Sequence, residues 1–69
     1  MIEAYSLARS ICKVIEDDNK RTKCVHLIAK ILIYGASVKD EVSGEISRVF
    51  TDEERSMLKK RIAEFLGQD

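Results

Sequence analysis

The sequence predicts an all-α fold, in which a single small domain (residues 1–69) contains four short helices packed around a central apolar helix at about residues 20–34. Three observations support this prediction. The chain has no proline and only three glycines, whereas sheets and long loops need such turn residues. Apolar residues recur at helical spacing along the chain. With 45% apolar and 35% charged residues, the composition is that of a globular protein and not of a disordered one.

The first predicted helix covers residues 2–17, because its apolar and polar residues fall on opposite halves of a helical wheel. The apolar half consists of Ala4, Leu7, Ala8, Ile11, Val14 and Ile15. The stretch DDNKRT that follows predicts a turn. In this turn Asp17, Asp18 or Asn19 can cap the next helix by accepting hydrogen bonds from its free backbone amides.

The second predicted helix, at about residues 20–34, is apolar around most of its circumference. The exception is a narrow stripe formed by Lys23, His26 and Lys30. Gly35 is expected to end this helix in the left-handed conformation. Because the other three helices have narrow apolar faces, a second copy of the chain is an additional candidate for covering this helix.

The third and fourth predicted helices cover residues 38–50 and 52–66, and each follows a capping-box pattern. In the first pattern Ser37 is the cap and Asp40 takes the place of the usual glutamate; in the second, Thr51 is the cap and Glu54 reaches back. Their apolar faces consist of Val38, Val42, Ile46, Val49 and Phe50 in the third helix, and of Leu58, Ile62, Phe65 and Leu66 in the fourth. Gly67 is expected to end the fourth helix.

The two cysteines, Cys12 and Cys24, lie at equal sequence distances from Asp18, so an antiparallel helix pair would bring them near each other. Packed helix axes are usually about 8–10 Å apart, whereas a disulfide needs Cα atoms within about 7 Å. We therefore expect two reduced, half-buried thiols, with a redox switch as the alternative. Cys24 and His26 do not suggest a zinc site, because residues two apart on a helix point in directions about 160° apart. No metal or cofactor is expected.

Catalysis finds little support in the sequence. No G-x-S-x-G motif and no glycine-rich phosphate loop occurs. The carboxylates fall in predicted first turns and on solvent faces, where the helix dipole and solubility explain them. A chain of 69 residues also has little volume for a pocket of the usual size. We expect a protein that is not an enzyme and has no catalytic residues.

Neither a signal peptide nor a membrane span is evident. The N-terminal stretch MIEAYSLARS lacks a basic start followed by an apolar run. The apolar stretch at residues 27–36 is ten residues long and contains Lys30, whereas a membrane span needs about 20 residues. We expect a soluble, cytoplasmic protein without a membrane partner. Small helical regulators of bacteria and their phages share this size and composition, although no motif here identifies one.

DNA binding is the alternative function, because residues 22–50 could form a helix-turn-helix with a glycine in the turn. The charge argues against it. Twelve basic residues balance twelve acidic ones, whereas nucleic-acid binders usually carry a positive excess. The early positions of the would-be recognition helix offer more negative than positive charge to a DNA groove; they are Ser37, Lys39, Asp40, Glu41 and Ser43.

The function that the sequence favours is a non-enzymatic protein-interaction module, a regulator, inhibitor or adaptor that forms a homodimer. On the helical wheel Ile33 lies about 20° from His26, while Leu32, Ile28 and Ile31 point elsewhere and are expected in the core. A half-exposed isoleucine at that position suggests an interface. The predicted interface residues are Ile33, Tyr34, His26, Lys30, Asp40 and Glu41. The acidic region 37–54 would orient a basic partner or the basic face of a second copy.

Overall fold

Four α-helices and two short 3-10 turns make up the part of the chain that the computed structural model describes, namely residues 2–65 and residue 67. In chain order these elements are α1 (Ile2–Ile11), η1 (Cys12–Val14), α2 (Asp18–Tyr34), η2 (Gly35–Val38), α3 (Lys39–Val49) and α4 (Asp52–Phe65). This part of the chain contains no strand, which confirms the all-α class. It also contains no helix that is long and apolar enough to cross a membrane.

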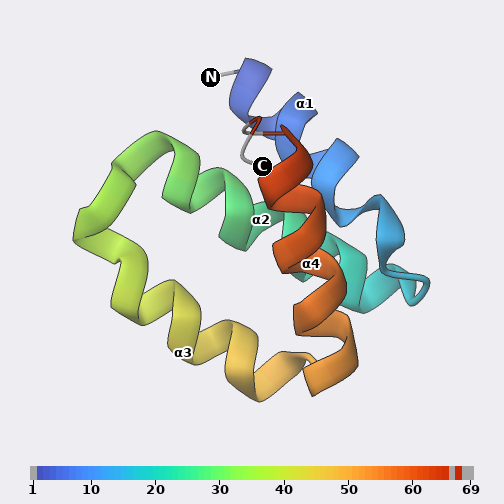
Figure 1. Ribbon diagram of the computed structural model, residues 1–69. Helices are drawn as coiled ribbons and strands as arrows, with labels where there is room; N and C mark the ends of the chain where they lie inside the picture. The colour runs from blue at the N-terminus through green and yellow to red at the C-terminus, as the bar shows by residue number, and fades with distance from the viewer. Residues whose placement is uncertain (1, 66, 68–69) are drawn as a thin grey trace.

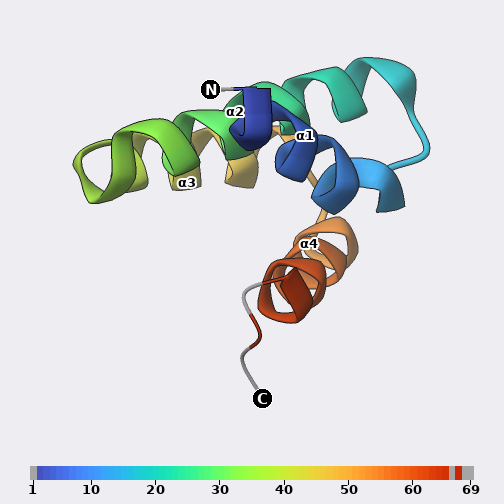
Figure 2. The ribbon, with the colours of Figure 1, turned by 90° about the horizontal axis from the view of Figure 1, so that it is seen from above.

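The helices form two connected hairpins and a fourth helix that lies to one side of them (Figure 1). The first hairpin joins α1 to α2, and the second joins α2 to α3 through η2. Figure 2 shows α4 beside the layer formed by α1, α2 and α3. The backbone of α2 packs on α1 and α3, but none of its Cα atoms lies within 8 Å of a Cα atom in α4. Side chains still connect the two helices, as in the ion pair between Lys20 and Glu54, so the all-helical fold is confirmed but the packing of all other helices around α2 is not.

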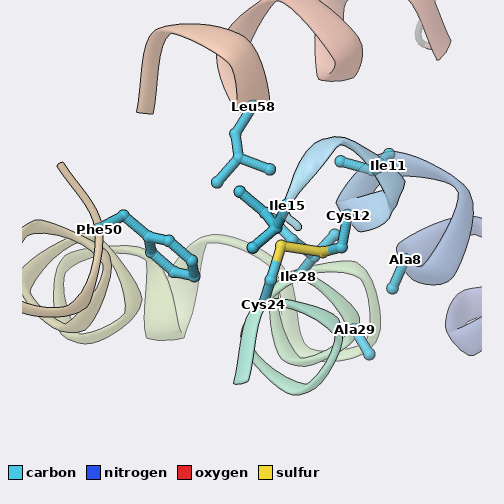
Figure 3. Packing of buried hydrophobic residues seen from close by; sticks show 9 residues of the cluster. All are labelled: Ala8, Ile11, Cys12, Ile15, Cys24, Ile28, Ala29, Phe50 and Leu58. Carbon is cyan, nitrogen blue, oxygen red and sulfur yellow. A yellow bond between two sulfur atoms is a disulfide. The ribbon is translucent and has the colours of Figure 1, made fainter. Parts of the chain in front are cut away.

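The hydrophobic core lies where α1, η1 and the middle of α2 meet α4 and the end of α3 (Figure 3). It consists of Ala8, Ile11, Cys12, Ile15, Cys24, Ile28, Ala29, Phe50 and Leu58. The predicted apolar face of the first helix supplies three of these residues, so that prediction is largely confirmed. The prediction that Phe65 lies in the core is wrong. Phe65 is 41% exposed, and the guanidinium of Arg61 lies over its ring. Leu66 is outside the described residues.

Cys12 and Cys24 form a disulfide bond within this core, so the expectation of two reduced thiols is wrong. Their Cα atoms are 5.8 Å apart, and both side chains are fully buried. The physical reason is the radius of the helix. Each Cα atom lies about 2.3 Å from its helix axis, so Cα atoms that face each other approach roughly 4–5 Å closer than the axes do. Axes about 8–10 Å apart are therefore compatible with a disulfide.

The first helix ends earlier than predicted, in the turn η1 and not at residue 17. Ile15 follows η1 in an extended conformation (φ −87°, ψ 119°) and is 1% exposed. An extended residue can point its side chain inward independently of the helical periodicity before it. Of the three predicted cap candidates Asp17 is the cap of α2, because its carboxylate accepts a hydrogen bond of 2.9 Å from the backbone N–H of Lys20. The helix begins at Asp18, two residues before the predicted start.

The predicted helix boundaries at Gly35 and Thr51 are confirmed. Gly35 ends α2 with a φ of 71°, a conformation that glycine adopts without steric cost. At α4 the capping box is complete: the backbone N–H of Glu54 donates to Thr51 Oγ1 at 3.1 Å, and that of Thr51 donates to the Glu54 carboxylate at 2.9 Å. The bond from the Thr51 amide, helped by Lys20 at 3.1 Å, lowers the pKa of Glu54 below its ordinary value.

The predicted cap at Ser37 is wrong. The turn η2 includes this residue, and its hydroxyl donates back to the carbonyl oxygen of Tyr34 at 3.0 Å instead of accepting from α3. Serine commonly makes such a bond to a carbonyl one turn earlier when it lies inside a helical turn. Helix α3 begins after Val38, which provides no side-chain cap.

Thr51→Ala is expected to lower the free energy of unfolding by about 0.5–2 kcal/mol, because the amide of Glu54 loses its acceptor. Ser37→Ala is the matched control. It removes an exposed hydroxyl that caps no helix, so its effect should stay within about 0.5 kcal/mol. Urea unfolding of both variants measures the difference. Equal losses of unfolding free energy in the two variants would show that the Thr51 hydroxyl does not stabilise α4 as a cap.

Candidate protein-interaction surfaces

The C-terminal end of α2 exposes three consecutive large apolar side chains, which we call the α2 end patch: Leu32, Ile33 and Tyr34. Their exposed fractions are 39%, 39% and 63%. The half-exposure expected for Ile33 is therefore confirmed. The core position expected for Leu32 is wrong, because α1 and α4 do not extend along α2 as far as this end (Figure 1).

Consecutive residues of an α-helix point about 100° apart, so three of them together sample most of its circumference. Exposure of all three means that the helix end is open on several sides at once. One turn earlier on the same helix, Ile28 and Ala29 are buried, at 4% and 0% exposed. The core therefore covers the middle of α2, whereas the end of α2 contacts only η2 and α3 among the described elements and leaves these three side chains partly exposed.

Three of the other predicted interface residues, Lys30, Glu41 and His26, contact partners within the chain. Lys30 forms an ion pair of 2.5 Å with Glu41, which joins α2 to α3. The hydrogen bond and the charge of this pair raise the pKa of Lys30 and lower the pKa of Glu41. His26 is exposed, and Tyr5 packs against it edge to face, with ring centroids 6.1 Å apart. Asp40 is exposed in the first turn of α3.

A second surface is an open hollow of about 800 Å³ between α2, α3 and α4, which we call the groove. Its apolar lining comes from all three helices and consists of Ile28, Ile31, Ile46, Leu58 and Ile62. Three of these side chains, Ile31, Ile46 and Ile62, are half-buried, so they are not fully covered by the chain itself. The groove thus presents apolar surface within a hollow whose volume is in the usual range for binding sites, so the expectation that a chain of this length has little volume for such a pocket is wrong.

Polar residues of α3 and α4 surround the apolar lining of the groove; they are Lys39, Ser43, Ser47, Asp52, Arg55, Ser56 and Lys59. Arg55 is paired with Asp52 and also donates to the hydroxyl of Ser47 at 3.0 Å. Lys39 and Lys59 form no ion pair with any residue that the structure describes. The edge of the groove therefore carries two unneutralised positive charges.

Sequence reasoning did not identify the groove. Its residues were assigned either to apolar core faces or to solvent, which is correct for each helix taken alone. The hollow arises because α4 lies beside the α2–α3 hairpin without touching the backbone of α2. The apolar periodicity of a single helix does not determine the angle at which that helix meets another one. The only available signal was that the apolar faces of the third and fourth helices are narrow.

Neither similarity to known proteins nor a group of metal-binding side chains identifies a function for this chain. No protein-family model, curated protein or solved structure matches this chain. Over residues 2–65 and 67, histidine, cysteine and carboxylate side chains do not gather in groups of three that could hold a metal ion. The two apolar surfaces are therefore the features from which a function is inferred.

Proposed function

We propose that this chain is a small, non-enzymatic protein-interaction module, a regulator, inhibitor or adaptor, which forms a homodimer through the α2 end patch. The observation that carries the proposal is the exposure of three consecutive large apolar side chains, Leu32, Ile33 and Tyr34, at the end of one helix. Removing such side chains from water is the main favourable term in protein association. Tyrosine is also enriched among residues that contribute most to interfaces.

Self-association accounts for a sequence feature that folding alone does not explain. A helix that is apolar on nearly all sides is normally covered on all sides. Here the chain covers the middle of α2 and leaves its end open. Two copies related by a two-fold axis would place the same patch against itself, which is the commonest way in which soluble proteins form dimers.

Ile33→Glu is expected to weaken self-association about a hundredfold, roughly 3 kcal/mol, because it places an unpaired carboxylate in the contact. The free subunit should keep its helical circular dichroism, since Ile33 is 39% exposed. Leu32→Glu should have the same effect, because Leu32 is also 39% exposed. Light scattering and sedimentation over a range of protein concentrations measure the dissociation constant.

Two control variants separate dimer loss from other effects. Thr22→Glu adds the same charge to the same helix, about 16 Å along its axis from Ile33, and should leave association unchanged. Ile28→Glu buries a charge in the core and should unfold the subunit. A wild-type protein that stays monomeric at millimolar concentration would rule out the homodimer and leave a foreign partner for the α2 end patch.

DNA binding stays the alternative proposal, and the distribution of basic residues disfavours it. Helix α3 contains two basic residues, Lys39 and Arg48, and three acidic ones. One of the three, Glu41, is paired with Lys30. A cluster of basic residues instead lines a smaller hollow of about 340 Å³ on the α1–α2 side, formed by Arg9, Lys13, Arg21, Thr22 and Val25. A helix-turn-helix would need its positive charge near α3.

Heparin chromatography separates the two proposals. We expect elution at low salt, because binding that resists salt requires several simultaneous contacts to anionic groups. Retention beyond about 0.4 M salt would place DNA binding ahead of protein binding. The Lys39→Glu and Lys60→Glu variants make the same change in net charge, so only a helix-turn-helix that uses α3 predicts that the first elutes earlier than the second.

A further inference from the structure

We propose that the groove binds an amphipathic helix of another protein, with an apolar stripe flanked by acidic residues. This inference goes beyond self-association, because the groove and the α2 end patch are different surfaces. The apolar lining of the groove would contact the apolar stripe of the partner helix, and the lysines at the edge of the groove would contact its acidic residues. A partner helix lying in a hydrophobic groove is a common mode of peptide recognition, in which anchors at helical spacing fill the groove.

The walls of the groove suit a helix because each is one continuous helix face. The lining positions on α3 are 39, 43, 46 and 47, and those on α4 are 52, 55, 56, 58, 59 and 62, so every position has another of its set three or four residues away. Three of these positions carry serine, at Ser43, Ser47 and Ser56. Short side chains on the walls let another backbone approach, while the isoleucines beneath supply the apolar contact.

The charges at the edge select the partner. Asp52 and Arg55 neutralise each other, which leaves Lys39 and Lys59, one on each wall. Carboxylates on both sides of an apolar stripe would match these two ammonium groups, and complementary charge at an interface favours the matching partner over others. The α2 end patch of a second copy does not fit, because neither its three residues nor the flanking Ile31 and Gly35 are acidic.

The test is a selection from a library of 16-residue helical peptides on the immobilised full chain. The apolar stripe is fixed as leucine, and the flanking positions vary among Asp, Glu, Ser, Lys and Arg. Selected peptides should be enriched in Asp and Glu at the flanks. A selected peptide should bind the variant with both Lys39→Glu and Lys59→Glu roughly tenfold more weakly, measured by fluorescence anisotropy.

Matched variants locate the binding. Lys23→Glu combined with Lys60→Glu makes the same charge change at exposed lysines outside the groove and should leave peptide affinity unchanged. Ser43→Phe fills the groove from an exposed position and should abolish binding while circular dichroism stays the same. A peptide in which lysine replaces the flanking carboxylates should instead prefer the variant with Lys39→Glu and Lys59→Glu.

Selection without acidic enrichment would overturn the proposal, and so would peptide binding that survives both Ser43→Phe and the Lys39→Glu, Lys59→Glu change. Light scattering on the same groove variants keeps this result separate from the proposed homodimer. Loss of peptide binding with unchanged self-association supports two independent surfaces. If Ser43→Phe abolishes peptide binding and self-association together, the groove is the homodimer contact and a foreign helix is not its occupant.

Discussion

Replacing both Cys12 and Cys24 by alanine is expected to lower the free energy of unfolding by about 2–4 kcal/mol. The bond closes a loop with a sequence separation of 12 residues, and it therefore restricts the unfolded chain. Both side chains are buried, so the loss of sulfur also leaves small voids in the core. For a domain of this size the midpoint of thermal unfolding should fall by roughly 10–30 °C.

Two measurements separate the bond from the packing of the sulfur atoms. Wild-type protein treated with a thiol reductant keeps both sulfurs and loses only the bond, so its midpoint should lie between those of the oxidised protein and the double alanine variant. Alkylation in denaturant without reductant, followed by mass spectrometry, counts the free thiols. Two alkylated cysteines in protein prepared under oxidising conditions would contradict the pairing.

The same alkylation experiment on protein taken from its native cell tests the proposed cytoplasmic location. Disulfides persist in oxidising compartments and are rare in the cytosol, where thiols are kept reduced. The disulfide in the structure and a cytoplasmic location therefore make opposite predictions for Cys12 and Cys24 in the cell. Reduced thiols there would support the location and make the bond a response to oxidation; a paired state would contradict the location.

The helix ends were predictable where residues within one short segment determine where the helix begins or ends. Asp17, Gly35 and Thr51 each act on a helix end within three or four residues of themselves, and the structure confirms all three. Ser37 shows the limit of such local patterns. A similar capping-box pattern occurs there, with Asp40 in place of the glutamate, but Ser37 lies inside the 3-10 turn that connects α2 to α3, and its hydroxyl donates to the carbonyl oxygen of Tyr34 instead.

The surfaces were less predictable, because exposure depends on the length and direction of neighbouring helices. A helical wheel gives the direction of Leu32 but not where the covering helices stop, so a residue expected in the core lies 39% exposed. The same wheel placed Ile33 correctly, since its direction is toward the polar stripe. The groove depends on the orientation of α4 relative to α2 and α3, which no single-helix pattern contains.

Leu58→Ala is expected to lower the free energy of unfolding by about 2–5 kcal/mol, because it removes the main apolar anchor of α4. Leu58 is 3% exposed and points toward Ile15 and Phe50 in the core (Figure 3). The other attachments of α4 are the half-buried Ile62 and polar contacts that are partly exposed. Lys20 pairs with Glu54 at 3.1 Å, and Arg61 donates to the carbonyl oxygen of Ser10 at 3.0 Å. Partly exposed contacts of this kind contribute much less than a buried leucine.

The neighbouring residue provides the matched control for Leu58. Met57 precedes it on the same helix and is 38% exposed, so Met57→Ala should change stability by less than about 1 kcal/mol. Leu58→Met keeps the volume of the anchor and should cost less than about 1.5 kcal/mol. Urea unfolding of the three variants gives both the midpoint and its slope.

Because α4 forms one wall of the groove, a Leu58→Ala protein that remains folded should also bind the selected acidic peptide more weakly. Equal losses for Met57→Ala and Leu58→Ala would show that α4 does not present Leu58 to the core, and the groove would then have a different lining.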